Sequence, residues 1–386
     1  MPRFIPFAIA LAVASAAHPD ARQNPEGPPD RPIFRLSVSL VQLDAVVTDA
    51  KGRHVTTLGP EDFEVYQDGR PQPVVAVSYI ETGDVWHDTS GLPPLPPEET
   101  KPEDARRVMA IVVDDLRMSF ESMHYARRGL KKFVENGFER GDRAMLVATS
   151  GAVRRPELTF SANVLKAAIN RLNFSLWGVR AASALAPVDG TPSDAFAGFQ
   201  EHNFALSAIE GVERTIDALK PLPGRKSVIL VSEGFTVFGF GMDNDFIRDS
   251  LQRLVDRANR AGVVVYAVDP RGLMVTGVTA ADNVSAARAA MLSRERSSAL
   301  RDSQDGLRYL SGETGGFAIV NNNDLAAGMR RIMADQQGYY LIGYQPESGT
   351  VTPDSSGRFR HVKIKVTRKG LKVRTRSGFY AVATEG

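Results

Sequence analysis

The order of apolar and polar residues divides the chain into a β-textured start, an alternating middle and a β-textured end. In the middle, short continuous apolar runs alternate with segments of helical periodicity. Such runs are typical of strands that are covered on both faces. We expect strands at 108–113, 144–148, 226–231, 263–268 and 316–320, and helices at 123–134, 164–172, 204–219, 246–261, 299–310 and 325–335. The alternation predicts a doubly wound, mostly parallel α/β sheet, interrupted by a long insertion or loop at 174–203.

Both ends of the chain have the alternation of half-buried strands. Near the C-terminus, Val362, Ile364 and Val366 alternate with lysines, and the Lys369-Gly370 turn predicts a hairpin with the basic strand at 371–376. Neither end is large enough to close a core alone. We therefore predict that residues 32–81 and 338–382 form one β-sandwich. The α/β domain at 106–337 is inserted between them, after a proline-rich linker at 82–105.

The N-terminus has the three parts of a secretory signal. One arginine is followed by an apolar run at 4–13 and by the small residues Ala14-Ser15-Ala16. We predict a signal peptide at 1–17 and a disordered leader at 18–31, and hence export to the periplasm, the outer surface or the medium. The apolar run is too short for a comfortable membrane span, so none is expected after cleavage.

Composition narrows the function classes. The 386 residues carry 47 basic and 45 acidic side chains, and a net charge of +2 does not indicate a nucleic-acid partner. The chain has no cysteine, which excludes disulfides and a lipid-modified cysteine. The sequence does not indicate an oligomeric state.

Candidate chemistry lies where the predicted parallel strands end, since open α/β sheets bind ligands at the carboxyl edge. The oxygen-bearing side chains there are Asp114, Asp115, Ser119, Thr149, Ser150, Thr159, Ser232 and Glu233. Carboxylate and hydroxyl oxygens without imidazole or thiol suit a hard cation such as Mg²⁺ or Ca²⁺. Such a cation can accept a carboxylate from a partner protein.

The order of these segments resembles that of von Willebrand factor A domains. The segments at 114–119, 310–316 (Leu-Ser-Gly-Glu-Thr-Gly-Gly), 339–344 (Tyr-Tyr-Leu-Ile-Gly-Tyr) and 374–380 are similar to exported A-domain-related proteins of acidobacteria. The resemblance covers most of residues 32–382. It implies a doubly wound sheet with a metal-ion-dependent adhesion site, and so a protein-binding or adhesion function.

The metal motif of that family is Asp-x-Ser-x-Ser, followed by a distant Thr and a distant Asp. Here Asp115 and Ser119 match, but Arg117 stands at the first Ser, and Ser232 or Glu233 stands at the distant Asp. The predicted ligands are Asp115, Ser119, Thr159 and Glu233, with Asp114, Ser232 and Thr149 as competitors. The alternative is that Asp115 and Ser119 only cap the following helix.

A glycine-rich segment at 234–241 follows the strand at 226–231. Arg117 and the aromatic residues Phe235, Phe238 and Phe240 are predicted to contact a protein partner there. The alternative is a packed loop, because aromatic side chains are usually buried.

Enzymatic signatures are missing from the sequence. The six histidines are scattered, there is no Gly-x-Ser-x-Gly motif, and Gly224-Arg225-Lys226-Ser227 lacks the upstream glycine of a phosphate loop. We therefore predict a binding protein that is not an enzyme. Two alternatives stay open: an exported hydrolase that uses Asp114, Asp115 and Glu233, and a metal-free structural protein of the envelope.

Overall fold

The computed structural model describes residues 40–82, 107–139, 141–153, 156–174, 194–222, 224–237, 242–278, 285–346 and 359–380, the side chains of 194–201, 242–244 and 380 excepted. The predicted signal peptide and leader lie outside these ranges, as does nearly all of the predicted linker. Residues 39–386 form one compact unit.

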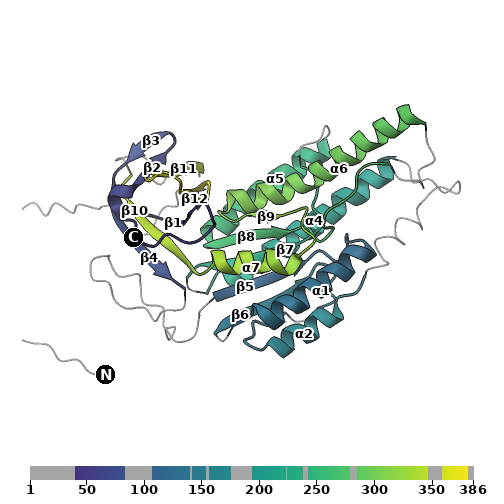
Figure 1. Cartoon of the computed structure of the whole chain (residues 1–386), viewed down its shortest axis with the longest axis horizontal. Helices are drawn as coiled ribbons and strands as arrows, with labels where there is room; N and C mark the ends of the chain where they lie inside the picture. The colour runs from purple at the N-terminus through teal and green to yellow at the C-terminus, as the bar shows by residue number, and fades with distance from the viewer. Residues whose placement is uncertain are drawn as a thin grey trace, which may run out of the picture. The chain divides into compact units, whose positions relative to one another are not determined.

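The central element is a five-stranded parallel sheet. Its strands are β5 (Arg107–Val113), β6 (Asp142–Ala148), β7 (Lys226–Val231), β8 (Val263–Val268) and β9 (Ala318–Ile319), in the order β6-β5-β7-β8-β9 (Figure 1). Strands β5, β7 and β8 are buried on both faces, which explains their largely continuous apolar sequences. Because the strands are parallel, their carboxyl ends lie along one edge of the sheet, which we call the carboxyl edge.

Helices cover both faces of this sheet. One face packs on α1 (Phe120–Asn136), α2 (Ala162–Arg171) and α7 (Leu325–Asp335), and the other on α4 (Asp194–Leu219), α5 (Met242–Arg260) and α6 (Ala286–Glu313). Side chains point to alternate faces along each strand, so consecutive residues such as Ile111 and Val112 pack in the two apolar cores on opposite faces of the sheet. The predicted α/β class with a parallel sheet is confirmed.

Two helices are longer than expected. The predicted loop at 174–203 was wrong in its last part, because α4 already begins at Asp194. Helix α6 begins 13 residues before the predicted start at 299, and the Ser285 hydroxyl caps its N-terminus by accepting from the Arg288 N–H. The first half of α6 has no apolar stripe, since its residues are exposed or half-buried, so periodicity missed it.

The strands at the two ends of the described chain form two antiparallel sheets. The first contains β12 (Lys372–Thr375), β1 (Val41–Thr48), β10 (Gly338–Tyr344) and β4 (Val74–Glu81), in that order. The second contains β13 (Gly378–Tyr380), β11 (Phe359–Val366), β2 (Phe63–Gln67) and β3 (Arg70–Gln72). One apolar cluster takes side chains from both sheets, including Leu43, Val65, Ile342 and Ile364. Segments far apart in sequence thus share a sandwich core.

The predicted hairpin near the C-terminus was wrong. Strand β11 pairs with β2 and β13, whereas β12 pairs with β1, so the two strands lie in different sheets. The turn at Lys369-Gly370 therefore crosses between the sheets. The expected basic face is divided accordingly: Lys363 and Lys365 are exposed, while Arg374 forms an ion pair with Asp335 of α7.

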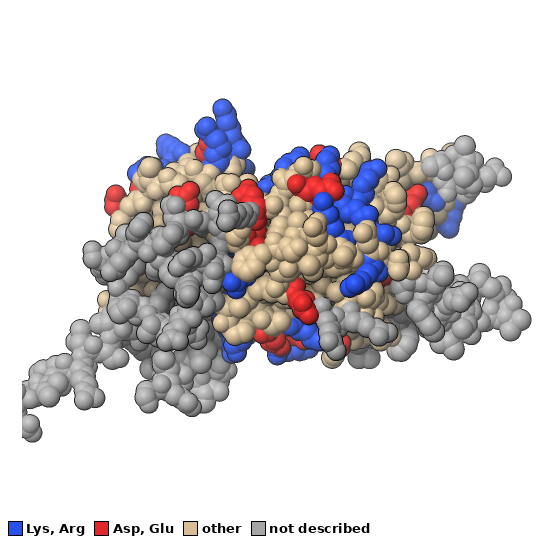
Figure 2. All heavy atoms as spheres, turned by 90° about the horizontal axis from the view of Figure 1, so that it is seen from below, with Lys and Arg blue, Asp and Glu red and all other residues tan. Residues whose placement is uncertain are grey.

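The surface carries charges of both signs. On the face seen in Figure 2, lysine and arginine side chains lie next to aspartates and glutamates. This mixture agrees with the small net charge of the sequence. Among the described residues, no helix is both long and apolar enough to cross a membrane.

Candidate functional site

The first strand of the parallel sheet ends in two buried aspartates. Asp114 is 0% exposed and Asp115 is 1% exposed. The Ser232 hydroxyl, at the end of β7, donates to Asp114 Oδ2 over 2.7 Å. The Thr149 hydroxyl, just after β6, lies 3.4 Å from Asp114 Oδ1 and donates to Asp115 Oδ1 over 3.1 Å. The carboxyl edge therefore brings together side chains from three strand ends.

Asp115 is held by the loop that follows β6. The Ser150 N–H donates to Asp115 Oδ1 over 2.8 Å, and the Ser150 hydroxyl donates to Asp115 Oδ2. Both carboxylate oxygens thus accept hydrogen bonds from within the chain. Asp115 does not cap α1, contrary to the capping alternative.

Ser119 does cap that helix. Its side chain accepts a hydrogen bond from the Ser122 N–H over 3.2 Å, and its own N–H donates to Glu233 Oε1 over 2.8 Å. Glu233 follows β7, so this bond ties the end of one strand to the start of the helix after another. A carboxylate at a helix N-terminus is also favoured by the helix dipole.

Burial changes the acidity of Asp114. Loss of solvent raises the pKa of this carboxyl from 3.8 to about 6, and the Asp115 charge acts in the same direction. The Ser232 hydrogen bond, the Arg117 charge and the Thr149 hydrogen bond lower this pKa and offset part of the rise. The Arg117 guanidinium is therefore near enough to Asp114 to stabilise its charged form.

Thr159 does not join this group. It forms an isolated bridge with Ala144, near the start of β6, whereas Thr149 follows the end of that strand. The Thr159 hydroxyl accepts from the Ser161 N–H over 3.0 Å. The threonine at the carboxyl edge is thus Thr149, which sequence reasoning kept only as a competitor.

The side chains of Asp114, Asp115, Thr149, Ser150 and Ser232, which we call the carboxylate cluster, have the chemistry that a hard cation prefers. They do not have the ligand arrangement of the Asp-x-Ser-x-Ser motif. All donors of the cluster are oxygens, as Mg²⁺ and Ca²⁺ prefer. However, Arg117 stands at the first Ser of the motif, and a guanidinium beside a cation raises the energy of both. Within the described residues, no three His, Asp or Glu side chains come together as a metal-binding group. The residues therefore do not fit a cation held in the Asp-x-Ser-x-Ser manner.

Phe235 is not a surface contact, which corrects its predicted role. It is 1% exposed and packs in the core between the sheet and helices α4 to α6. Its N–H donates to the Ser303 carbonyl of α6 over 2.9 Å. The packed-loop alternative therefore holds for this residue. Phe238 and Phe240 lie outside the described residues.

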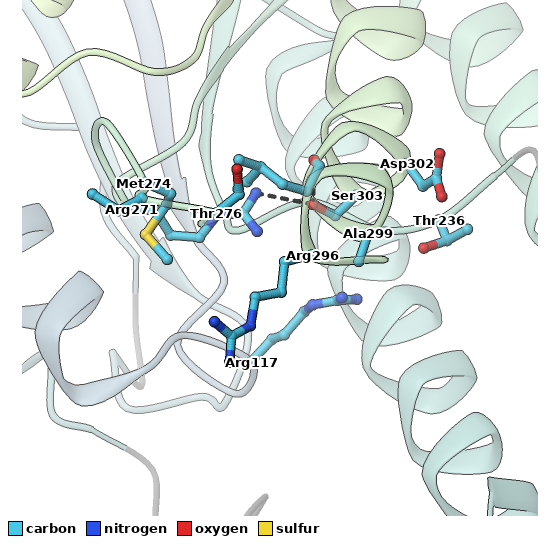
Figure 3. A pocket seen from close by; sticks show the side chains of 11 residues that line it. Arg117, Thr236, Arg271, Met274, Thr276, Arg296, Ala299, Asp302 and Ser303 are labelled. Atoms are coloured by element: carbon cyan, nitrogen blue, oxygen red, sulfur yellow. Dashed lines mark hydrogen bonds between the residues drawn. The ribbon is translucent and has the colours of Figure 1, made fainter. Parts of the chain in front are cut away.

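A pocket of about 720 Å³ opens beside the carboxylate cluster. Its walls come from the turns after β5, β7 and β8 and from α6 (Figure 3). The polar groups that line it include Arg117, Thr236, Arg271, Arg296, Asp302 and Ser303. Pockets of this volume at the carboxyl edge of an α/β sheet usually bind ligands.

Arg271 is fixed in the wall of this pocket. Its Nε and Nη2 atoms donate to Asp269 over 2.9 and 2.7 Å, and Nη2 also donates to the Ser303 hydroxyl over 3.0 Å. The Gln304 amide donates to Asp269 as well, over 2.9 Å. Asp269 is 0% exposed, so its charge is buried behind the arginine.

Sequence reasoning missed the contribution of β8 and α6. Asp269-Pro270-Arg271 directly follows a buried strand, as Asp114 and Ser232 do, and that position was the available signal. No signal marked Arg296, Asp302 and Ser303, because the half of α6 that carries Arg296 has no apolar periodicity. Of the two predicted partner contacts that the structure describes, Arg117 and Phe235, only Arg117 lines the pocket.

Comparison with known proteins adds little. No protein-family model matches the chain, and neither does any curated protein sequence. Among solved structures, the open conformation of the pilus adhesin SpaC from Lactobacillus rhamnosus GG is 12% identical, with a TM-score of 0.31. The alignment covers 83% of this chain and 48% of the adhesin, and another form of the adhesin gives 11% identity, 85% and 49% coverage and the same TM-score. The chain thus spans about half the adhesin's length, and a TM-score this low carries no argument.

Proposed function

We propose that this chain is an exported protein-binding or adhesion module, related to von Willebrand factor A domains, that holds its partner at the carboxyl edge of the parallel sheet. The observation that carries the proposal is the pocket at that edge. It is lined by residues from the turns after β5, β7 and β8 and by residues of α6. Four separate segments converge on one surface, which is typical of a binding site on a rigid scaffold.

The pocket also has the residue types of a protein interface. Arginine and methionine are enriched in such interfaces, and Arg117, Arg271, Arg296 and Met274 line this pocket. Val275 in its wall and the nearby Leu273 are 78% and 67% exposed, which is unusual for neighbouring large apolar side chains.

In this proposal the partner is held without a cation. Hydroxyl and N–H donors of the chain already hold the carboxylates of Asp114 and Asp115. These bonds hold the turn after β5 against the turns after β6 and β7. The carboxylate cluster therefore determines the shape of the carboxyl edge. The competing form is a Mg²⁺- or Ca²⁺-dependent module, favoured by the convergence of Asp115, Thr149 and Ser150 oxygens.

We also propose that the chain is not a hydrolase. A hydrolase needs a nucleophile with a base that can take its proton. The Ser150 and Ser232 hydroxyls donate to the carboxylates of Asp115 and Asp114, which accept from other donors as well, and they accept from the Ala152 and Gly234 N–H groups. This arrangement supports a structural use of the two serines.

The proposal can be tested with a phage library of random 12-residue peptides, panned on the purified protein. The informative variant is Ala299→Trp, because Ala299 is an exposed residue of α6 that lines the pocket. The matched control is Ala290→Trp, at an exposed position of the same helix that does not line it. Both variants add the same side chain, so helix stability and surface hydrophobicity change alike.

The expected result is a set of enriched peptides whose affinity falls at least about tenfold in Ala299→Trp and stays unchanged in Ala290→Trp, since filling the pocket excludes the ligand. Absence of enriched peptides, or equal binding by both variants, would contradict the proposal. Adding 5 mM Mg²⁺ or Ca²⁺, and separately removing cations with EDTA, decides between the two forms. A requirement for the cation would favour the competing form.

A further inference from the structure

A small cavity lies at the amino edge of the parallel sheet, where the α/β domain meets the β-sandwich. Its volume is about 10 Å³, which is room for one particle the size of a water molecule. Residues from β5, β7 and β8 line it, together with residues that flank β7, α7 and β4: Arg107, Lys226, Ser227, Tyr266, Arg225, Gln336 and Thr82. Three of these seven residues are cationic and none carries a carboxylate. The lining therefore favours a ligand that is anionic or neutral.

The guanidinium group of Arg225 has no counter-ion in the part of the chain that the structure describes. Its Nε and Nη1 atoms are buried and have no hydrogen-bond acceptor there. The Tyr339 ring lies against it, with the ring centroid 5.4 Å from Cζ. Asp44 borders a second small cavity that Arg225 also lines, but the two side chains do not form an ion pair. A guanidinium group always carries its charge, so burying it without an acceptor is unfavourable.

The other two cations of the cavity already have partners. The Nε and Nη2 atoms of Arg107 donate to the two carboxylate oxygens of Asp142 over 2.7 and 2.8 Å. The Nζ atom of Lys226 donates to the Leu222 carbonyl over 2.7 Å. The need for an acceptor therefore comes from Arg225 and not from the number of cations in the lining.

Gln336 adds a second buried donor to the cavity. Its side chain is 8% exposed, and its Oε1 atom accepts a hydrogen bond from the Ser227 hydroxyl over 2.9 Å. Its Nε2 atom is buried and has no acceptor among the described residues. Buried N–H groups are nearly always hydrogen-bonded in folded proteins. The lining therefore offers N–H groups from two side chains to whatever occupies the cavity.

Positive charge also lies next to the cavity. Arg374 forms an ion pair with Asp335, while its Nε atom is buried without an acceptor in the described chain. Asp335 accepts a second hydrogen bond, from the Tyr266 hydroxyl over 2.7 Å. Burial lowers the pKa of Arg374, and the nearby charge of Arg225 acts in the same direction. The two guanidinium groups thus repel each other, and a negative charge between them and the sheet relieves this repulsion.

We infer that this cavity binds a single monoatomic anion such as chloride, held between Arg225 and Gln336. The anion accepts hydrogen bonds from the buried N–H groups of both side chains and compensates the guanidinium charge. A water molecule accepts only two hydrogen bonds and brings no charge, and polyatomic anions exceed the volume of the cavity. Because the lining joins the sheet to the end of the sandwich strand β4, the anion stabilises the junction. The site is separate from the proposed binding site, which lies at the opposite edge of the sheet.

Thermal unfolding of the whole chain, followed by far-ultraviolet circular dichroism, tests this inference. Sodium chloride is exchanged stepwise for sodium gluconate at a constant total of about 200 mM, so screening by salt does not change. Gluconate is too large for the cavity. The unfolding midpoint of the wild type should rise with chloride and saturate, by about 2–3 °C if chloride is then about ten times its dissociation constant.

Two variants and a control assign the effect to the cavity. Arg225→Gln should remove the chloride dependence, because a neutral side chain needs no counter-ion. Gln336→Glu places a carboxylate of similar shape beside the guanidinium group, so its midpoint should be equal in both salts and no lower than that of the wild type in gluconate. The matched control is Arg301→Gln, which removes the same charge from an exposed position of α6 outside the cavity. It should keep the wild-type rise.

Each variant is compared with itself in the two salts, so a general loss of stability does not hide the result. Equal midpoints of the wild type in chloride and gluconate would show that the cavity holds water only, and would overturn the inference. A rise of the same size in Arg225→Gln would place the chloride effect elsewhere, with the same consequence. If that variant does not fold, crystals of the wild type grown in sodium bromide decide. An anomalous-scattering peak in contact with Arg225 and Gln336 is expected, and its absence would contradict the assignment.

Discussion

The buried carboxyl group of Asp114 makes the stability of the protein depend on pH in a defined direction. Burial raises the pKa of this group from 3.8 to about 6, so the folded chain holds its proton more tightly than the unfolded chain. Between these two pKa values the folded state binds more protons, and the free energy of unfolding therefore falls as pH rises. The loss continues as pH rises through the folded pKa and is nearly complete above about pH 7.

The size of the effect follows from the shift. A difference of about two pKa units corresponds to about 3 kcal/mol at 1.4 kcal/mol per unit. The perturbation that isolates it is Asp114→Asn, which has a similar shape and can still accept the 2.7 Å hydrogen bond from Ser232 but cannot ionise. Relative to this variant, the wild-type protein should lose about 2.5 kcal/mol between pH 4 and pH 7, because a small part of the loss has already occurred at pH 4.

Urea denaturation of both proteins at pH 4, 5, 6, 7 and 8, followed by far-ultraviolet circular dichroism, measures the difference directly. Other carboxyl groups titrate in this range, but they contribute equally to both proteins and cancel in the comparison. A difference that is constant across the range would show that Asp114 is not perturbed by burial. A difference that grows in favour of the wild type would show that its charged form is stabilised, as a bound cation would do.

Three further predictions concern other parts of the fold. Asp62→Asn should behave oppositely to Asp114→Asn in the same denaturation series. The Gly59 N–H, followed by the Arg368 side chain, lowers the pKa of Asp62, so its contribution is present above pH 3.8 and is lost as pH falls through the folded pKa. Gly234→Ala should destabilise the protein by more than about 2 kcal/mol in thermal unfolding, because φ is +82° and a Cβ would lie 2.0 Å from a backbone oxygen of α6. The control Gly224→Ala, with φ +71° and open space, should cost only about 1 kcal/mol, and equal losses would contradict this reading. Tyr344→Phe should cost about 1–3 kcal/mol, because Gln67 loses the 2.6 Å hydrogen bond from the Tyr344 hydroxyl that joins the two sheets, and an unchanged urea midpoint would argue against this bond.

The sequence predicted the α/β core well for a physical reason. Strands covered on both faces must be continuously apolar, and the runs at 226–231 and 263–268 coincide with β7 and β8. The amphipathic helix at 325–335 likewise coincides with α7. The hairpin near the C-terminus failed because alternation identifies a strand without identifying its partner. Pairing of β12 with β1 depends on residues more than 300 positions apart.

The candidate site was only partly predictable. The topological rule located the carboxyl edge and its aspartates correctly, because parallel strands end together. The family motif placed Thr159 there, but a motif order cannot tell which of two threonines lies beyond the end of β6. The pocket itself depends on how α6 packs over the turns after β7 and β8. That packing is set by close contacts such as the one between Gly306 and the Phe235 ring, which sequence periodicity does not encode.

Hydrogen–deuterium exchange locates the binding surface of the protein most directly. The purified protein is labelled alone and with a saturating amount of the most enriched peptide, and the exchange of each segment is compared. We expect protection in the segments at 116–119, 232–237, 271–278 and 296–303, which contain the pocket-lining residues. Protection confined to the β-sandwich strands, with these four segments unchanged, would contradict the account.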